Sequence, residues 1–412
     1  MTKHLLVLFF CLFLVMMGFG ITLPVFPFYA ERLARAGGAS QGVAAVHVGL
    51  LTGVYALMQF LCAPLWGRWS DRIGRKPLVL IGIGGFAMAQ ALFGLANSLW
   101  LFYGARLIGG ILSSAMFPAV TAYVADVTTE DERSRGMAWE GTAVSLGVVF
   151  GPALGGLLAR SDLQLRMGSD RLTIPAFSVP FFVAALLALL TLPVVIRWLP
   201  ESFLPSVSAF APEKQAANGW RDLGTQLWPL LTLTLAAQFG LAMFEATFAL
   251  HAREMLGYGP ARVGAVFMVC GSVMSVFQGG AVGYLAPRMS AGYQIALGFV
   301  LMGVDLAVLL FARSTSLVLT IVGLLALGMA LITPNLTALV SKGQKQQTGA
   351  ALGLRNAANS LGQTAGPALG GLLFALDMRA AYSITGALLV GIGIISGRVL
   401  QRGNIGRPEQ RI

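Results

Sequence analysis

Charged residues are scarce in this 412-residue chain. They make up 11% of it, whereas soluble domains usually contain about 25%. Aspartate and glutamate together number 17, against 28 lysines and arginines. No stretch of the chain is long enough and polar enough to fold as a soluble catalytic domain, which argues against a soluble enzyme.

Histidine and cysteine are also rare, with three of each. His4, His47 and His251 lie far apart and lack the spacing of metal ligands, so no metal site is predicted. The cysteines fall in apolar runs, which favours packing over disulfides. The Gly-x-x-x-x-Gly-Lys-Ser/Thr loop that binds nucleotide phosphates is missing, so neither ATP nor another cofactor is expected.

Long apolar runs dominate the chain, which is 56% hydrophobic. A helix needs about 20 apolar residues to cross a bilayer, and many runs reach that length. They predict an all-α integral membrane protein with twelve transmembrane helices, at about 5–28, 46–66, 77–96, 99–123, 137–159, 175–198, 226–251, 261–285, 292–312, 316–340, 350–376 and 380–398.

The net charge of +11 is distributed as the positive-inside rule requires. Most lysines and arginines lie in the segments on the same side as the N-terminus, so both termini are predicted to be cytoplasmic, and no nucleic-acid partner is expected. The predicted organisation is a six-helix bundle at 1–198, a cytoplasmic linker at 199–225, a second six-helix bundle at 226–398 and a cytoplasmic tail at 399–412.

A repeated segment relates the two halves. The sequence SLGVVFGPALGGLL at 145–158 returns as SLGQTAGPALGGLL at 360–373, an offset of 215 residues. A duplicated hydrophobic segment interrupted by Gly and Pro is typical of transporters built from repeats. Proline bends a helix and small residues allow close helix contact. The residues concerned are Gly147, Gly151, Pro152, Gly155, Gly156, Gly366 and Pro367.

A second motif, GRWSDRIGRK at 67–76, lies between the second and third apolar runs. In this motif Asp71 lies among several lysine and arginine residues. As an anion, it could cap the N-terminus of a nearby helix. Arg75 is expected to pair with Asp126 at the inner end of the fourth helix. The predicted cytoplasmic gate consists of Gly67, Asp71, Arg72, Gly74, Arg75, Asp126, Glu140 and Arg355, the last two being repeat counterparts.

These motifs resemble those of the major facilitator superfamily. The loop matches its signature, and Arg106-Leu-Ile-Gly109-Gly110 and the Gly/Pro segment are similar to motifs of its drug:proton antiporters with twelve helices. The resemblance implies two pseudo-symmetric six-helix bundles in the bacterial cytoplasmic (inner) membrane. It also implies export of small amphipathic molecules, such as drugs, in exchange for protons by alternating access.

Proton coupling requires an ionisable group at membrane depth, where an ionised carboxylate costs at least ~2.5 kcal/mol. Glu245 in the seventh run is the leading candidate, followed by Arg106, whose guanidinium needs an acceptor when buried, and Asp305. Tetracycline exporters, which the first half resembles, carry acids in the first and third helices. This chain has Val15 and Ala89-Gln90 there.

The substrate is expected to contact aromatic, methionine and amide side chains. The candidates are Phe26, Tyr29, Gln59, Tyr123, Gln238, Met243, Phe248, Asn335, Asn359 and Gln363. The predicted partners are a small-molecule substrate, protons and the lipid bilayer, with the protein a monomer. Export of a metabolite, sugar or lipid is the alternative, whereas an intramembrane enzyme would need convergent acids or metal ligands that the sequence lacks.

Overall fold

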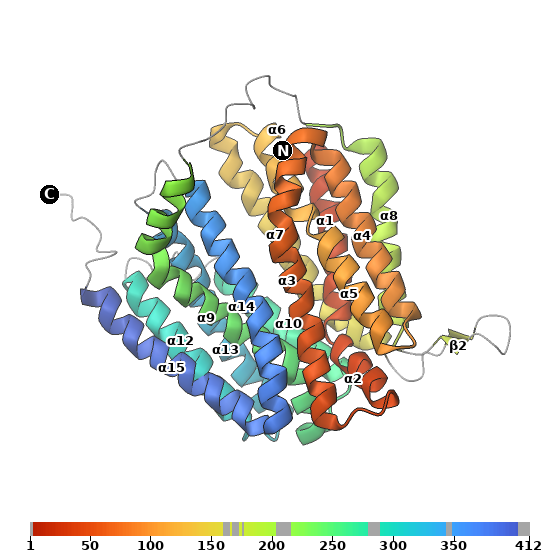
Figure 1. The fold of residues 1–412 in the computed structure, drawn as a ribbon, viewed down its shortest axis with the longest axis vertical. Helices are drawn as coiled ribbons and strands as arrows, with labels where there is room; N and C mark the ends of the chain where they lie inside the picture. Colours follow the sequence, from red (N-terminus) through yellow and green to blue (C-terminus); the bar gives the residue numbers. More distant parts are fainter. Residues whose placement is uncertain are drawn as a thin grey trace. The chain divides into compact units, whose positions relative to one another are not determined.

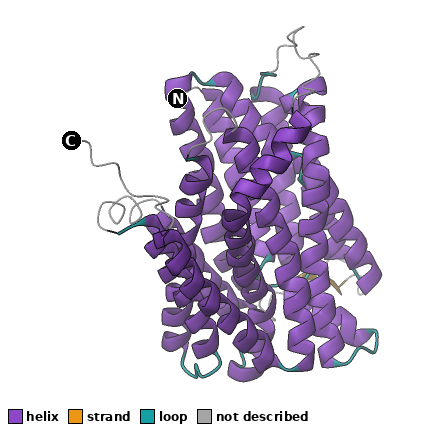
Figure 2. Cartoon of the chain, turned by 60° about the vertical axis from the view of Figure 1, so that its left-hand side comes forward, coloured by secondary structure: helices purple, strands orange, loops and turns teal. Residues whose placement is uncertain are grey.

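The computed structural model describes residues 3–159, 165–166, 173–174, 177–202, 216–278, 289–342 and 348–402. Almost all of these residues are helical (Figures 1 and 2). The helices are α1 (Lys3–Thr22), α2 (Phe26–Ala36), α3 (Gln41–Ile73), α4 (Arg75–Leu95), α5 (Leu99–Ser113), α6 (Met116–Val127), α7 (Glu130–Leu158), α8 (Val179–Trp198), α9 (Ala216–Leu256), α10 (Pro260–Val276), α12 (Ala291–Leu309), α13 (Thr315–Ser341), α14 (Thr348–Leu376) and α15 (Met378–Arg402). Between α7 and α8, two short antiparallel strands pair, β1 (Leu165–Arg166) and β2 (Thr173–Ile174).

Ten spans in the described residues are long and apolar enough to cross a membrane. Helix α10 is apolar but has only 17 described residues, and α14, with 29 residues, is not among the ten. Each of the twelve predicted runs contains a helix, so the all-α membrane fold is confirmed. The number of twelve crossings stays a prediction.

Two of the predicted runs are broken. The run at 5–28 was expected to be one helix, but α1 ends at Thr22 and a turn containing Pro24 leads into α2. The run at 99–123 divides into α5 and α6 at Ser114 and Ala115, just before Pro118. Proline explains both breaks, because it has no N–H to donate to the preceding turn. Helix α9 begins at Ala216, inside the predicted linker.

The contacts divide the chain into two compact units. The first comprises Met1–Phe210 and Ala249–Met268, and the second comprises Ala211–Phe248 and Val269–Ile412. The last residues of α9 and most of α10 therefore group with the first unit. The predicted bundle boundaries at 198, 226 and 398 stay a prediction.

Helix α1 lies at the centre of the first unit, where it packs against α7 and α8. Its buried face carries Leu8, Leu12 and Val15, which share a core with Ile83 of α4 and Tyr123 of α6. Because α1 is apolar around most of its circumference, it fits a helix surrounded by others. In the second unit, α12 packs against both α13 and α15.

Candidate functional site

The loop between α3 and α4 is organised around Arg75. Gly74 adopts a positive φ of 99°, which glycine accepts without strain, and Arg75 then begins α4. The Arg75 side chain is buried and donates three hydrogen bonds: to Ser70 Oγ at 2.8 Å, Asp71 Oδ1 at 2.6 Å and Asp126 Oδ2 at 3.0 Å. The predicted contact between Arg75 and Asp126 is confirmed.

Glu201, three residues after the end of α8, contacts the other side of the same loop. Its carboxylate accepts hydrogen bonds from the backbone N–H groups of Arg75, at 2.8 Å, and Lys76, at 3.1 Å. A carboxylate at the first turn of a helix is favourable because the unpaired N–H groups and the helix dipole both attract it. A Cβ at Gly74 would lie 2.5 Å from the Glu201 carboxylate, so this position favours glycine for its space as well.

Sequence reasoning missed Glu201 and expected Asp71 to serve as a cap. In the described residues Asp71 binds the Arg75 side chain, while Glu201 caps α4. The position of Glu201, three residues after the last residue of the sixth run, was the available signal. Arg72 is exposed, and a side chain at Gly67 would meet open space, so neither residue is required by packing in the described structure.

Arg106 occupies an aromatic cage in the first unit. Its guanidinium carbon lies 3.7 Å from the centre of the Phe26 ring, 5.1 Å from that of Tyr55 and 5.3 Å from that of Phe93. Arg106 Nε is buried and has no hydrogen-bond partner among the described residues. The expected acceptor is therefore replaced by ring faces, whose negative quadrupole attracts a cation. Tyr55 is held by a 2.8 Å hydrogen bond to Ser113.

The intramembrane acids differ in their surroundings. Glu245 in α9 is half-buried and makes no hydrogen bond or ion pair within the described residues. Asp305 in α12 is buried, and its Oδ2 has no partner in the described structure. Both carboxyl groups are thus available to a proton without first breaking another contact.

Glu140 and Arg355, which occupy corresponding positions of the repeat, each use only part of their hydrogen-bonding capacity within the described residues. In the first unit, Glu140 Oε1 accepts a 2.8 Å hydrogen bond from Thr121, and its buried Oε2 has no partner among the described residues. In the second unit, Arg355 donates to the Thr333 carbonyl at 3.4 Å, and its Nε is likewise without a partner there. Their role as gate contacts stays a prediction.

The candidate substrate residues fall into two groups. Gln59, Asn359 and Gln363 are half-buried, whereas the following are buried: Phe26, Tyr29, Tyr123, Gln238, Met243, Phe248 and Asn335. Two of the buried polar side chains, Tyr29 and Asn335, donate hydrogen bonds within the fold. Tyr29 donates to the Ala96 carbonyl at 2.6 Å, and Asn335 donates to Gln294 at 3.0 Å.

The acid positions of tetracycline exporters are filled by core residues here. Val15 is fully buried in the core around α1, and Gln90 is buried in α4 with no partner for its Oε1 among the described residues. Neither Val15 nor Gln90 is ionisable, so neither side chain can carry a coupled proton.

The glycines of the repeated segment form a ladder in each unit. On α7, Cβ atoms added at Gly147 and Gly151 would lie 2.5 Å from Met16 Cβ and 2.6 Å from Gly20 Cα, and one at Gly155 would collide with the Ile21 carbonyl. Helices α7 and α1 therefore touch backbone to backbone, as small residues permit.

The second ladder joins α14 to α9. Cβ atoms added at Gly362 and Gly366 would each lie 2.5 Å from a backbone carbonyl, of Leu235 and Phe239 respectively, and one at Gly370 would lie 2.6 Å from Met243 Cγ. The predicted equivalence of the two Gly/Pro helices is confirmed, because each packs against the first long helix of its half through glycines at corresponding positions. Pro152 and Pro367 lie within these helices.

One ion-paired acid was not anticipated. Glu31 of α2 is buried and accepts a 2.6 Å contact from Arg253 at the end of α9, with Arg35 at 3.7 Å. Nearby, Gln41 donates to Glu254. Glu31 lies in the short helix α2, whose first turn contains Pro27, whereas Glu254 belongs to α9. In the described part of the chain, no group of three His, Cys, Asp or Glu side chains is placed to bind a metal.

Long apolar helices joined by glycine ladders, with buried ionisable groups that have no partner among the described residues, are the features of a multi-pass membrane protein. A model of the Major Facilitator Superfamily matches residues 8–346. The chain therefore belongs to the Major Facilitator Superfamily. Its function is to move small molecules across a lipid bilayer rather than to catalyse a reaction.

Relatives match over nearly the whole chain. Multidrug resistance protein 2 of Bacillus subtilis is 30% identical over 390 residues, which cover 93% of this chain and 92% of that protein. Quinolone resistance protein NorA of Staphylococcus aureus is 26% identical over 406 residues, 96% of each chain. These relatives support a bacterial multi-pass membrane protein.

Solved structures show the same fold. The human organic anion transporter MFSD10 has a TM-score of 0.68 at 24% identity and covers 95% of this chain and 98% of its own. A POT family transporter has a TM-score of 0.78 at 14% identity, with coverage of 97% and 96%. At these identities the likeness concerns the fold alone.

Proposed function

We propose that this protein exports small amphipathic molecules, drugs among them, from the cytoplasm in exchange for protons by alternating access. The observation that carries the proposal is the carboxyl group of Glu245, which lies half-buried in a membrane helix. Among the described residues it has no hydrogen-bond or ion-pair partner. An intramembrane acid without a partner is a functional candidate, because it can exist there cheaply only when protonated or neutralised by a cation. The full-length similarity to multidrug resistance proteins supports the same function.

The proposed arrangement places both termini in the cytoplasm and the protein, as a monomer, in the bacterial cytoplasmic membrane. The excess of lysine and arginine on one side supports this orientation. The Asp71–Arg75–Asp126 cluster and its Glu201 cap then lie at the cytoplasmic side, where they would stabilise one of the two access states.

Transport into proteoliposomes tests the proposal directly. Purified protein is reconstituted with an imposed proton gradient and supplied with a panel of cationic dyes, quinolones, sugars and lysolipids. We expect gradient-dependent uphill movement of the dyes and drugs, abolished by a protonophore. Selective movement of sugars or lysolipids would instead support the alternative exporter, and movement unaffected by the protonophore would contradict proton antiport.

The Asp71→Asn variant should impair transport while leaving substrate binding within about twofold of the wild type. The substitution removes a charged acceptor from Arg75 but touches none of the candidate substrate residues, and a hydrogen bond to a charged group contributes about 1.5–3 kcal/mol. Binding is measured by fluorescence quenching in detergent, and transport in proteoliposomes. The matched control is Asp377→Asn at the start of α15, whose carboxylate accepts a hydrogen bond from the backbone N–H of Arg379 and from no other group in the described residues. Unchanged transport by Asp71→Asn would contradict a gating role.

A further inference from the structure

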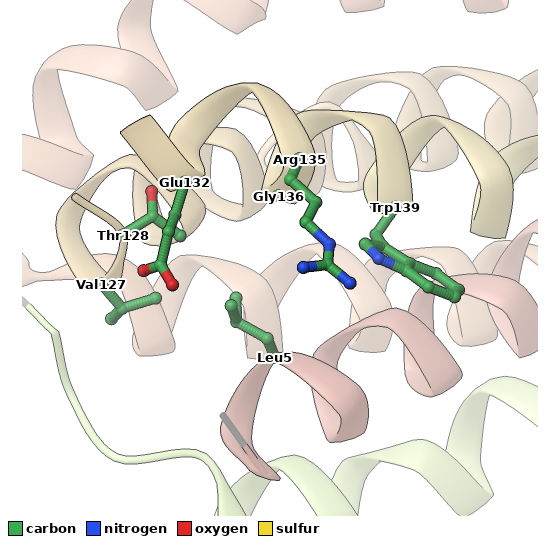
Figure 3. A pocket seen from close by; sticks show the side chains of 7 residues that line it. All are labelled: Leu5, Val127, Thr128, Glu132, Arg135, Gly136 and Trp139. Carbon is green, nitrogen blue, oxygen red and sulfur yellow. The ribbon is translucent and has the colours of Figure 1, made fainter. Parts of the chain in front are cut away.

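A pocket of about 210 Å³ lies in the first unit, where ends of α1, α6 and α7 meet (Figure 3). Sites for drug-sized ligands are usually about 300–1,000 Å³, so this pocket is too small for a whole drug molecule. None of the residues proposed above for proton coupling or substrate contact lines it. The lining residues are Leu5, Val127, Thr128, Glu132, Arg135, Gly136 and Trp139.

Two side chains of opposite charge, Glu132 and Arg135, extend into the pocket from the first turns of α7. Figure 3 shows the Glu132 carboxylate and the Arg135 guanidinium on the same side of the helix, above Leu5. Residues three apart on a helix are neighbours and would readily pair. Yet within the described residues no ion pair joins them, and the only contact of the Glu132 carboxylate is a 3.4 Å hydrogen bond from Thr129. Within the described residues, the pocket thus presents two exposed side chains of opposite charge, Glu132 and Arg135, that are not paired with each other.

The pocket lies at the boundary of the apolar spans. The spans of α1 and α7 begin at Lys3 and Arg135, and that of α5 and α6 ends at Val127. Trp139 is 42% exposed one turn inside that boundary, the depth at which amphipathic rings gather at membrane interfaces. Gly136 lets α7 approach α6 here, because a Cβ at this position would lie 2.8 Å from Val124 Cγ1.

We propose that this pocket binds the zwitterionic head group of phosphatidylethanolamine. Arg135 would hold the phosphate, for which a guanidinium is suited by its paired donors, and Glu132 would accept hydrogen bonds from the ammonium group. Leu5 and Trp139 supply the apolar and interfacial surfaces that the glycerol region of a lipid contacts. Phosphatidylglycerol has the same phosphate but no cationic group for Glu132, and phosphatidylcholine has no N–H to donate to that carboxylate.

Native mass spectrometry of the purified protein with added lipids tests this site. We expect phosphatidylethanolamine to bind more tightly than phosphatidylcholine or phosphatidylglycerol of identical acyl chains. Glu132→Gln should weaken phosphatidylethanolamine binding about tenfold and remove the preference over phosphatidylcholine, because it loses one charge-assisted hydrogen bond. Arg135→Gln should weaken binding of both lipids, and Arg135→Lys should restore part of it.

The matched control is Arg133→Gln, which makes the same charge change in the same helical turn. Arg133 does not line the pocket, and among the described residues its guanidinium donates only to the Ala125 carbonyl, at 3.5 Å. Equal lipid binding by wild type, Glu132→Gln and Arg135→Gln would overturn the proposal, as would equal loss in Arg133→Gln. Soluble glycerophosphoethanolamine should compete poorly, and competition equal to that of the lipid would overturn a membrane source for the ligand. Melting temperatures in detergent verify that each variant is folded.

Discussion

Replacing Glu245 with glutamine is expected to abolish uphill, proton-driven efflux while leaving downhill substrate exchange intact. Glutamine keeps the size of the side chain but cannot bind and release a proton. An ionised carboxylate at this depth costs at least ~2.5 kcal/mol, and either a proton or a cationic substrate relieves that cost. Proton and substrate would then compete directly for one group, which produces antiport without a long-range pathway.

The measurement compares gradient-driven accumulation with counterflow exchange in the same proteoliposomes. Glu254→Gln provides the control, since it removes an exposed acid from the end of the same helix α9. Uphill efflux that survives in Glu245→Gln would place the proton site elsewhere. Asp305, whose Oδ2 is buried and without a partner in the described structure, would then be the next residue to test, followed by Arg106.

Adding a single methyl group at Gly151 should strongly destabilise the protein. In Gly151→Ala the new Cβ would lie 2.6 Å from both Gly20 Cα and the Met17 carbonyl oxygen, and a backbone neighbour cannot rotate away as a side chain can. Overpacking of this kind costs about 1–3 kcal/mol, occasionally more. We expect a melting temperature several degrees below that of the wild type and a corresponding loss of transport.

Gly141→Ala is the matched control for this substitution. Gly141 lies on the same helix, and a Cβ there meets nothing within 4 Å. Alanine is about 1 kcal/mol more favourable than glycine in a helix interior, so Gly141→Ala should be neutral or stabilising. Gly366→Ala should reproduce the Gly151→Ala defect in the second unit, where its Cβ would lie 2.5 Å from the Phe239 carbonyl oxygen. Equal stability of Gly151→Ala and Gly141→Ala would contradict the ladder.

The helices and one ion pair could be predicted from sequence because their causes are local. Apolar length defines a membrane helix, and the contact between Arg75 and Asp126 was predicted from charges placed at the inner ends of neighbouring helices. The breaks near Pro24 and Pro118 were missed, since a run of apolar residues remains apolar across a turn. Hydropathy reports the environment of a residue and not the continuity of its backbone.

The contacts of the site depended on neighbours distant in sequence. Glu201 caps a helix that begins 126 residues earlier, and no periodicity marks such a partner. Arg106 was expected to find an oxygen acceptor, but its neighbours are the rings of Phe26, Tyr55 and Phe93, which come from three other helices. Side chains that satisfy a buried charge through ring faces look like ordinary core residues in a sequence.

The two glycine ladders also account for an uneven divergence between the halves. Where two backbones touch, almost every substitution inserts atoms that the neighbouring helix cannot accommodate, so glycine is required at the same positions in both copies of the segment. The segments at 145–158 and 360–373 differ only where Val148, Val149 and Phe150 correspond to Gln363, Thr364 and Ala365. The glycines themselves are identical in the two copies, so the close backbone contact in each unit depends on the same positions of the repeat.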